Sequence, residues 1–270
     1  MRRARPVLFL LARVLLAAWI LSAAALFLLQ RRIVFAAPPD TVAPTARGAT
    51  LLSVPTAAGW RVAALHWPGR PGARTVVHFH GNGEQLAWQV DLAETLHAAG
   101  YGVVAMEYPG YGVMRAVEPT EATLYAAADT LLRHLEGPLA IPRDRLVLQG
   151  FSLGTGVASE MARRGHGSRL VLIAPYTSMA DMGALSAPWL PARWMVRDRF
   201  DTWSRAPAIA APTLLVHGDA DDLIPPAMSA ALARRFPDAR RVLLPGTHHN
   251  DVFARSMIEL VDALRRFAPP

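Results

Sequence analysis

The chain has 270 residues, of which 52% are hydrophobic and 18% charged, with 19 Gly and 22 Pro. This composition excludes a disordered, collagenous or coiled-coil protein, and the length suits one α/β domain or two small ones. The formal net charge of +7 falls to +1 when the six arginines that precede Asp40 are left out. The remainder is nearly neutral, so no nucleic-acid partner is predicted.

Two residue types are absent from the sequence. It contains no Cys, which excludes a disulfide framework, a thiolate nucleophile and a Cys-ligated zinc. All 28 basic residues are Arg and none is Lys, which excludes a lysine Schiff base or lysine general base. Together with the many alanines, this usage indicates a GC-rich bacterial genome.

The N-terminal segment 1–32 is predicted to be a membrane anchor. The run from Val14 to Leu29 carries no charge. With Arg13 reaching toward the headgroups, it approaches the roughly 20 residues that a bilayer crossing needs. A cleaved signal peptide is the alternative, with a candidate cleavage site at Ala23–Ala25, although the apolar run continues beyond it. The chain is therefore predicted to be a single-pass protein of a bacterial inner membrane. The balance of arginines favours a cytoplasmic N-terminus and a folded domain outside the cytoplasm.

Residues 33–48 lack a regular hydrophobic pattern and are interpreted as a tether to a domain at 49–270. Within that domain the predicted strands are Leu51–Val54, Arg61–Trp67, Thr75–Phe79, Gly102–Glu107, Arg145–Leu148, Leu170–Ile173, Thr213–Val216 and Arg241–Leu244. Helical patterns lie between most of them, for example at Thr120–Leu135 and Phe253–Leu264. This alternation predicts an α/β fold with a mostly parallel sheet of about eight strands, flanked by helices.

A candidate nucleophile follows the strand Arg145–Leu148. The sequence Gln149-Gly150-Phe151-Ser152-Leu153-Gly154 opens a helical stretch, which places Gly-x-Ser-x-Gly between a strand and a helix. Glycines on either side allow a strained turn that raises the serine above the sheet. We therefore predict Ser152 as the nucleophile, with a glycine-rich turn of no catalytic role as the alternative.

A serine nucleophile needs a histidine to remove its proton and an acid to orient that histidine, in the chain order Ser, Asp, His. His166 lies in a polar turn and is expected to be solvated. His217 ends an apolar strand, where a structural role is expected. The base is therefore expected to be His248 or His249, on a loop between the last strand and the last helix.

The acid is expected on the loop that follows Thr213–Val216. Asp219, Asp221 and Asp222 all lie there, and spacing alone does not choose among them. Any of the three could equally be a solvated carboxylate or a cap for a helix that begins at Pro226.

Six segments in this order resemble the α/β-hydrolase superfamily. They are His80-Gly81-Asn82-Gly83, Tyr108-Pro109-Gly110-Tyr111-Gly112, Gly150-Phe151-Ser152-Leu153-Gly154, Ala174-Pro175-Tyr176-Thr177-Ser178, Asp198-Arg199-Phe200-Asp201 and His249-Asn250-Asp251. More narrowly, the chain is similar to small membrane-anchored serine hydrolases, which include α/β-hydrolase-domain depalmitoylases and serine-aminopeptidase-like proteins. The resemblance implies the α/β-hydrolase fold from about Leu51 to the C-terminus.

The resemblance also implies site residues. It places the acid on Asp221, within His-Gly-x-x-Asp-x-x-Ile-Pro, and the base on His249. An oxyanion hole would be formed by the backbone N–H groups near Asn82 and of Leu153, because a tetrahedral intermediate needs donors where negative charge develops.

A segment at about 176–207 is interpreted as a short cap. Its aromatic and methionine side chains are expected to line an acyl-binding pocket, with a packed helical insertion as the alternative. These side chains are Trp189, Trp194, Met195, Phe200 and Trp203, with Pro191 among them.

The predicted function is a serine hydrolase that cleaves an ester or thioester of a small or lipid-like acyl substrate through an acyl-enzyme. A bilayer held close by the anchor would favour such substrates. A peptidase of the same fold and a non-catalytic binding protein are the alternatives. No metal or organic cofactor is predicted, because no ligand spacing or phosphate-binding loop occurs. Since the catalytic segments lie beyond residue 75, deletion of residues 1–32 is expected to leave the site intact.

Overall fold

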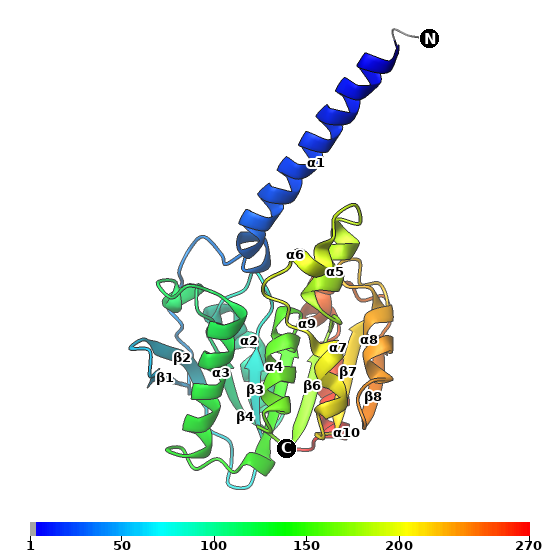
Figure 1. The fold of residues 1–270 in the computed structure, drawn as a ribbon. Coiled ribbons are helices and arrows are strands. Elements are labelled where there is room, and N and C mark those ends of the chain that lie inside the picture. The colour runs from blue at the N-terminus through cyan, green and yellow to red at the C-terminus, as the bar shows by residue number, and fades with distance from the viewer. Residues whose placement is uncertain (1–3) are drawn as a thin grey trace.

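The computed structural model describes residues 4–270, in which one long helix projects from an α/β domain (Figure 1). That helix, α1, spans Ala4–Val34. Residues 1–3 of the predicted anchor lie outside the described residues. The stretch Val7–Val34 is long and apolar enough to cross a membrane, and a signal sequence near an N-terminus has the same character.

Eight strands form a single sheet in the order β1-β2-β4-β3-β5-β6-β7-β8. The pairs β1·β2 and β2·β4 are antiparallel, and the other neighbours are parallel. The strands are β1 (Thr50–Pro55), β2 (Arg61–Trp67), β3 (Thr75–Phe79), β4 (Gly102–Met106), β5 (Leu146–Phe151), β6 (Arg169–Ile173), β7 (Thr213–Gly218) and β8 (Ala239–Leu244). The predicted fold class is confirmed, because each predicted strand overlaps an observed one.

Helices cover both faces of this sheet (Figure 1). One core forms under α3 (Glu121–Glu136), α4 (Leu153–Arg163) and α8 (Pro226–Ala233), and the other under α2 (Val90–Ala98) and α10 (Met257–Phe267). Side chains alternate along each strand. Val77 of β3 therefore packs in the first core and its neighbour Val76 in the second.

The predicted C-terminal helix is interrupted. It forms α9 (Val252–Arg255) and α10, separated at Ser256. The Ser256 hydroxyl lies 2.7 Å from Thr247 Oγ1 and is buried. This contact fastens the start of α10 to the loop after β8.

The prediction that His166 is solvated is wrong. Its side chain is buried, with Nδ1 2.9 Å from Glu136 Oε1 and Nε2 3.0 Å from Asp129 Oδ1. Both carboxylates belong to α3, so this histidine joins the end of α4 to its neighbouring helix. The sequence pattern around His166 gives no sign of partners that lie 30 and 37 residues away.

Three short helices form the cap between β6 and β7. They are α5 (Met179–Ser186), α6 (Ala192–Met195) and α7 (Thr202–Arg205). In Figure 1 the α5 and α6 helices lie at the same end of the domain as the base of α1. The segment predicted as a tether lies against the domain there, because Phe35 is buried and its ring contacts Phe200 edge to face at 6.1 Å.

Candidate active site

Ser152 occupies a strained turn between β5 and α4. Its backbone has φ 48° and ψ −116°, a combination that costs free energy for any residue with a side chain and is typical of a nucleophilic serine on such a turn. A Cβ added to Gly150 would lie 2.3 Å from the Gly154 carbonyl oxygen, and one on Gly154 would lie 2.0 Å from that of Phe79. The turn therefore requires glycine at both positions.

The structure brings His249, and not His248, to this serine. His249 begins a short 3₁₀ turn after β8 and is buried. Its Nε2 lies 3.0 Å from Ser152 Oγ, and its ring stacks on Phe151 with the centroids 5.2 Å apart. The His248 side chain is exposed.

Asp221 lies on the far side of the His249 ring. His249 Nδ1 donates to Asp221 Oδ2 at 2.7 Å, and the backbone N–H of Ile224 donates to Oδ1 at 2.8 Å. Burial acts to raise the pKa of the Asp221 carboxyl, but hydrogen bonds from His217, His249 and Ile224 outweigh it and hold that pKa well below its usual range. The carboxylate is ionised at neutral pH, so Nδ1 carries the proton and the Nε2 lone pair faces Ser152.

The other two candidate aspartates have different positions. Asp219 Oδ1 accepts a hydrogen bond from Gly246 N at 2.6 Å, which joins the loops after β7 and β8. The Asp222 side chain is 76% exposed, and its Oδ1 lies 3.9 Å from His248 Nδ1. Of the three, Asp221 alone reaches His249.

The Asp221 arrangement predicts a large and specific effect of substitution. Asp221→Asn retains an acceptor for the Ile224 N–H but removes the charge that fixes the His249 tautomer, so any hydrolysis that depends on Ser152 should fall about 10³- to 10⁴-fold. Asp222→Asn, the matched control, should leave turnover within about twofold because its side chain is exposed. Equal losses in the two variants would contradict the assignment of the acid.

The same carboxylate predicts a pH dependence of stability. A carboxyl whose pKa is depressed in the folded state stabilises the fold above its unfolded pKa, about 3.9, and this contribution is lost as the pH falls further. The difference in unfolding free energy between wild type and Asp221→Asn should therefore be smaller at pH 3 than at pH 7. Chemical denaturation at the two pH values measures it, and a difference that grows at pH 3 would reverse the sign.

The sequence interpretation understated the part played by His217. It is completely buried, and its Nε2 lies 2.9 Å from the Ile224 carbonyl oxygen and 3.2 Å from Asp221 Oδ2. His217 thus supports the acid from behind. Its position near the end of β7, four residues before Asp221, is the signal that could have identified it. Gly218, which follows His217, allows the backbone at Thr247 to approach closely. A Cβ on Gly218 would lie 2.1 Å from the Thr247 carbonyl oxygen.

The two predicted oxyanion residues, Asn82 and Leu153, line the same cavity as Ser152. Leu153 is the first residue of α4, where a backbone N–H has no intrahelical acceptor. The Asn82 side chain is engaged elsewhere: its Oδ1 accepts from Ala36 N and Tyr111 Oη, both at 2.8 Å. A contribution from Asn82 to an oxyanion hole would therefore come from its backbone.

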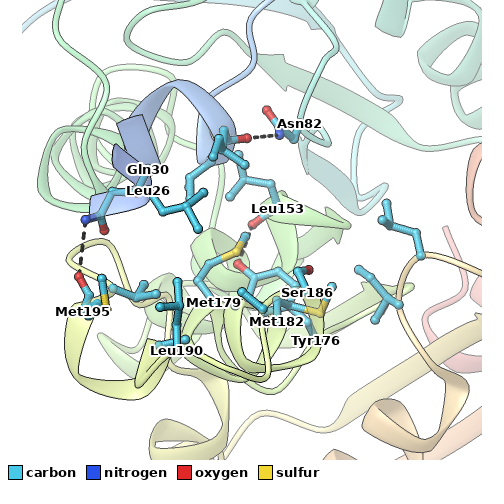
Figure 2. Close-up of a pocket in the computed structure, with 18 of the residues that line it drawn as sticks. Leu26, Gln30, Asn82, Leu153, Tyr176, Met179, Met182, Ser186, Leu190 and Met195 are labelled. Carbon is cyan, nitrogen blue, oxygen red and sulfur yellow. Dashed lines mark hydrogen bonds between the residues drawn. The ribbon is translucent and has the colours of Figure 1, made fainter. Parts of the chain in front are cut away.

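A cavity of about 320 Å³ extends from Ser152 between α1 and the cap (Figure 2). Methionines form much of its cap side, at Met179, Met182 and Met195. Of the side chains that the sequence predicts to line the pocket, only Met195 does so. Trp189, Trp194 and Trp203 are exposed, and Phe200 is buried in the core. Ala192 and Met195 share the inner face of α6, and Trp194, between them, points away.

The opposite side of the cavity is α1 itself. The residues that contribute are Leu26, Phe27, Gln30, Ile33 and Val34. The expectation that residues 1–32 are separable from the site conflicts with this lining.

The described residues 4–270 contain no group of three or more His, Asp or Glu side chains that could hold a metal ion.

Comparisons with known proteins agree with this architecture. A family model described as "Serine aminopeptidase, S33" matches residues 71–200. An uncharacterized protein of Mycobacterium tuberculosis strain H37Rv is 31% identical over 244 residues, which cover 88% of this chain and 86% of that protein. The "Alpha/beta hydrolase domain-containing protein 17C" of Xenopus tropicalis is 26% identical over 67% of this chain and 58% of its own length.

The fold is shared with solved enzymes. An esterase of Pyrococcus furiosus superposes with a TM-score of 0.68 at 16% identity, over 85% of this chain and 98% of its own. An esterase from Exiguobacterium antarcticum gives 0.64 at 16% identity, over 82% of this chain and 100% of its own. With the sheet order, the strained serine turn and these relatives together, the chain belongs to the α/β-hydrolase superfamily.

Proposed function

We propose that the protein is a serine hydrolase that cleaves an ester or thioester acyl bond through an acyl-enzyme. The observation that carries the proposal is the chain of hydrogen bonds from Asp221 through His249 to Ser152, which opens into an apolar cavity. The catalytic steps follow from the positions of the protons. Ser152 Oγ holds one, His249 Nδ1 holds another, and His249 Nε2 is free to accept the serine proton.

Ser152 Oγ attacks the acyl carbonyl carbon as its proton passes to His249 Nε2. Asp221 stabilises the resulting imidazolium, and the N–H groups of Leu153 and Asn82 would donate to the oxyanion. When the tetrahedral intermediate collapses, the bond to the alcohol or thiol breaks and His249 returns the proton to it. Water then repeats the sequence on the acyl-enzyme and releases the acid.

The cavity favours acyl substrates over peptides with a free amino terminus. Of the described residues that line it, none is Asp or Glu. An aminopeptidase must hold the α-ammonium of its substrate, and transfer of that charge into an apolar site without a counter-ion is costly. A methionine-rich surface instead adapts to a flexible alkyl chain.

A substrate panel tests this function. Purified protein should hydrolyse p-nitrophenyl acetate, octanoate and palmitate and an acyl thioester, and should leave alanine p-nitroanilide nearly untouched. The physical reason is the uncharged lining, which suits an acyl chain and offers nothing to an ammonium group. Faster cleavage of the anilide than of every ester would favour the peptidase, and no Ser152-dependent cleavage at all would favour a binding protein.

The apolar α1 supports a location at a membrane, since many of its large side chains are exposed to solvent in the isolated chain. We propose that it is an uncleaved anchor. N-terminal sequencing of the protein from its native host separates the alternatives, because a signal peptide would give a mature chain that begins near Leu26.

A further inference from the structure

Polar contacts fix the base of α1 to the cap. A freely moving anchor would lack such contacts. Gln30 Nε2 donates to the Met195 carbonyl oxygen at 3.3 Å (Figure 2). Gln30 Oε1 accepts from Arg197 N at 2.8 Å. Arg31 pairs with the buried carboxylate of Asp198, with Nε 3.1 Å from Oδ2. The last turns of α1 therefore have a defined rotation relative to the cap.

A second contact joins α1 to the loop beside the nucleophile. Asn82 Nδ2 donates to the Ile33 carbonyl oxygen at 3.2 Å (Figure 2). Its Oδ1 accepts from Ala36 N. Asn82 belongs to the loop that would supply an oxyanion donor. The end of the apolar helix and the candidate active site are thus parts of one packed unit.

The cap also follows α1 far toward its N-terminus. Trp19 Nε1 donates to the Trp189 carbonyl oxygen at 3.0 Å. At 1.5 Å per residue, the interval between Trp19 and Gln30 is about 16 Å of helix with the cap alongside. The part of α1 from Val7 to Ala18 is then only about 18 Å long, whereas the hydrocarbon core of a bilayer is about 30 Å thick.

The loop that carries Trp189 lies beside a part of α1 that a membrane-crossing helix would hold in the bilayer. If α1 crosses a bilayer, the hydrocarbon must extend past Trp19 and reach the loop that carries Trp189. The apolar side chains of this part of the cap are suited to it: Trp189 is 61% exposed and Trp194 90% exposed, and Leu185, four residues before Trp189, is also exposed. Tryptophan is the residue enriched where a protein meets the lipid–water interface.

We propose that the cavity between α1 and the cap opens into the bilayer and takes one acyl chain of a membrane-resident ester or thioester, with α1 as its selective wall. This inference rests on the proposed function and adds the source and path of the substrate. The chain would leave the lipid beside Trp189, lie between Leu26 and the cap methionines, and present its carbonyl to Ser152.

The role of α1 as the selective wall of the cavity is tested with two substitutions in this helix, made in the full-length protein. Leu26 lines the cavity, whereas Leu28 is 75% exposed and does not. Leu26→Trp should lower kcat/KM for p-nitrophenyl palmitate about tenfold or more relative to acetate, because the added ring occupies the space of the chain. Leu28→Trp should leave the ratio unchanged. The same ratio in both variants would overturn the proposal.

Access from the bilayer is tested with palmitate ester embedded in phosphatidylcholine vesicles. Trp194→Glu puts a charge on the exposed face of the cap. It should lower turnover of the vesicle-embedded palmitate ester severalfold, while turnover of p-nitrophenyl acetate in solution stays constant. Leu139→Glu, a charge on an exposed apolar side chain after α3, is the control. Unchanged vesicle turnover in Trp194→Glu would refute the bilayer path.

A binding measurement keeps these outcomes separate from the proposed function. Full-length Ser152→Ala protein in detergent should bind a dansyl-labelled undecanoic acid, more weakly with Leu26→Trp and equally well with Leu28→Trp. If wild type hydrolyses no ester but this pattern holds, the proposed function fails and the acyl site stands. If turnover is present and the pattern is absent, the acyl site fails instead.

Discussion

Replacement of Ser152 by alanine is expected to abolish covalent labelling by a fluorophosphonate and to lower ester turnover on the order of 10⁶-fold. The reason is geometric. Ser152 Oγ lies 3.0 Å from His249 Nε2, on a turn strained to φ 48°, so it is both activated and accessible from the cavity. Labelling is read by mass spectrometry of the modified peptide and turnover by p-nitrophenol release.

Ser186→Ala is the matched control for this experiment. Ser186 also presents a hydroxyl to the cavity, on the cap helix α5 (Figure 2). Among the described residues no histidine forms a hydrogen bond with its side chain, so Ser186 should be neither labelled nor needed for turnover. Labelling of the Ser152→Ala protein at the same rate as wild type would show that the nucleophile lies elsewhere.

The serine turn and the strands of the sheet could be predicted because each depends on residues that are close together in the sequence. Short apolar runs give the strands, and the two glycines around Ser152 describe a turn that a side chain at either position would block. The spacing of the two glycines therefore predicts the geometry of the turn without information from residues far away in the sequence.

The choice among the three aspartates could not be made locally. Asp219, Asp221 and Asp222 lie within four residues of one another, and the difference between them arises from the path of the loop after β7. That loop turns so that one carboxylate faces His249, a second holds the Gly246 amide and the third is exposed. Resemblance to a family supplied the assignment that spacing did not.

The contribution of α1 to the cavity could not be predicted from the sequence. An apolar helix has the same sequence pattern whether it faces lipid or packs against a cap, and the contacts at Gln30 join residues about 165 positions apart. One signal was present. Gln30 is an uncharged polar residue at the end of the apolar run, and its amide satisfies a backbone N–H and a backbone carbonyl of the cap.

His249→Ala is expected to lower the acylation rate on the order of 10⁶-fold, while the neighbouring His248→Ala should retain turnover within about threefold of wild type. Only one imidazole can lie between Ser152 and Asp221, and the two His249 nitrogens are 3.0 and 2.7 Å from those partners. His248 is exposed and approaches Asp222 only at 3.9 Å. Fluorophosphonate labelling kinetics measure the acylation step directly, and circular dichroism of both variants checks that they fold. A greater loss from His248→Ala, with both proteins folded, would mean that the loop after β8 is shifted by one residue in the working enzyme.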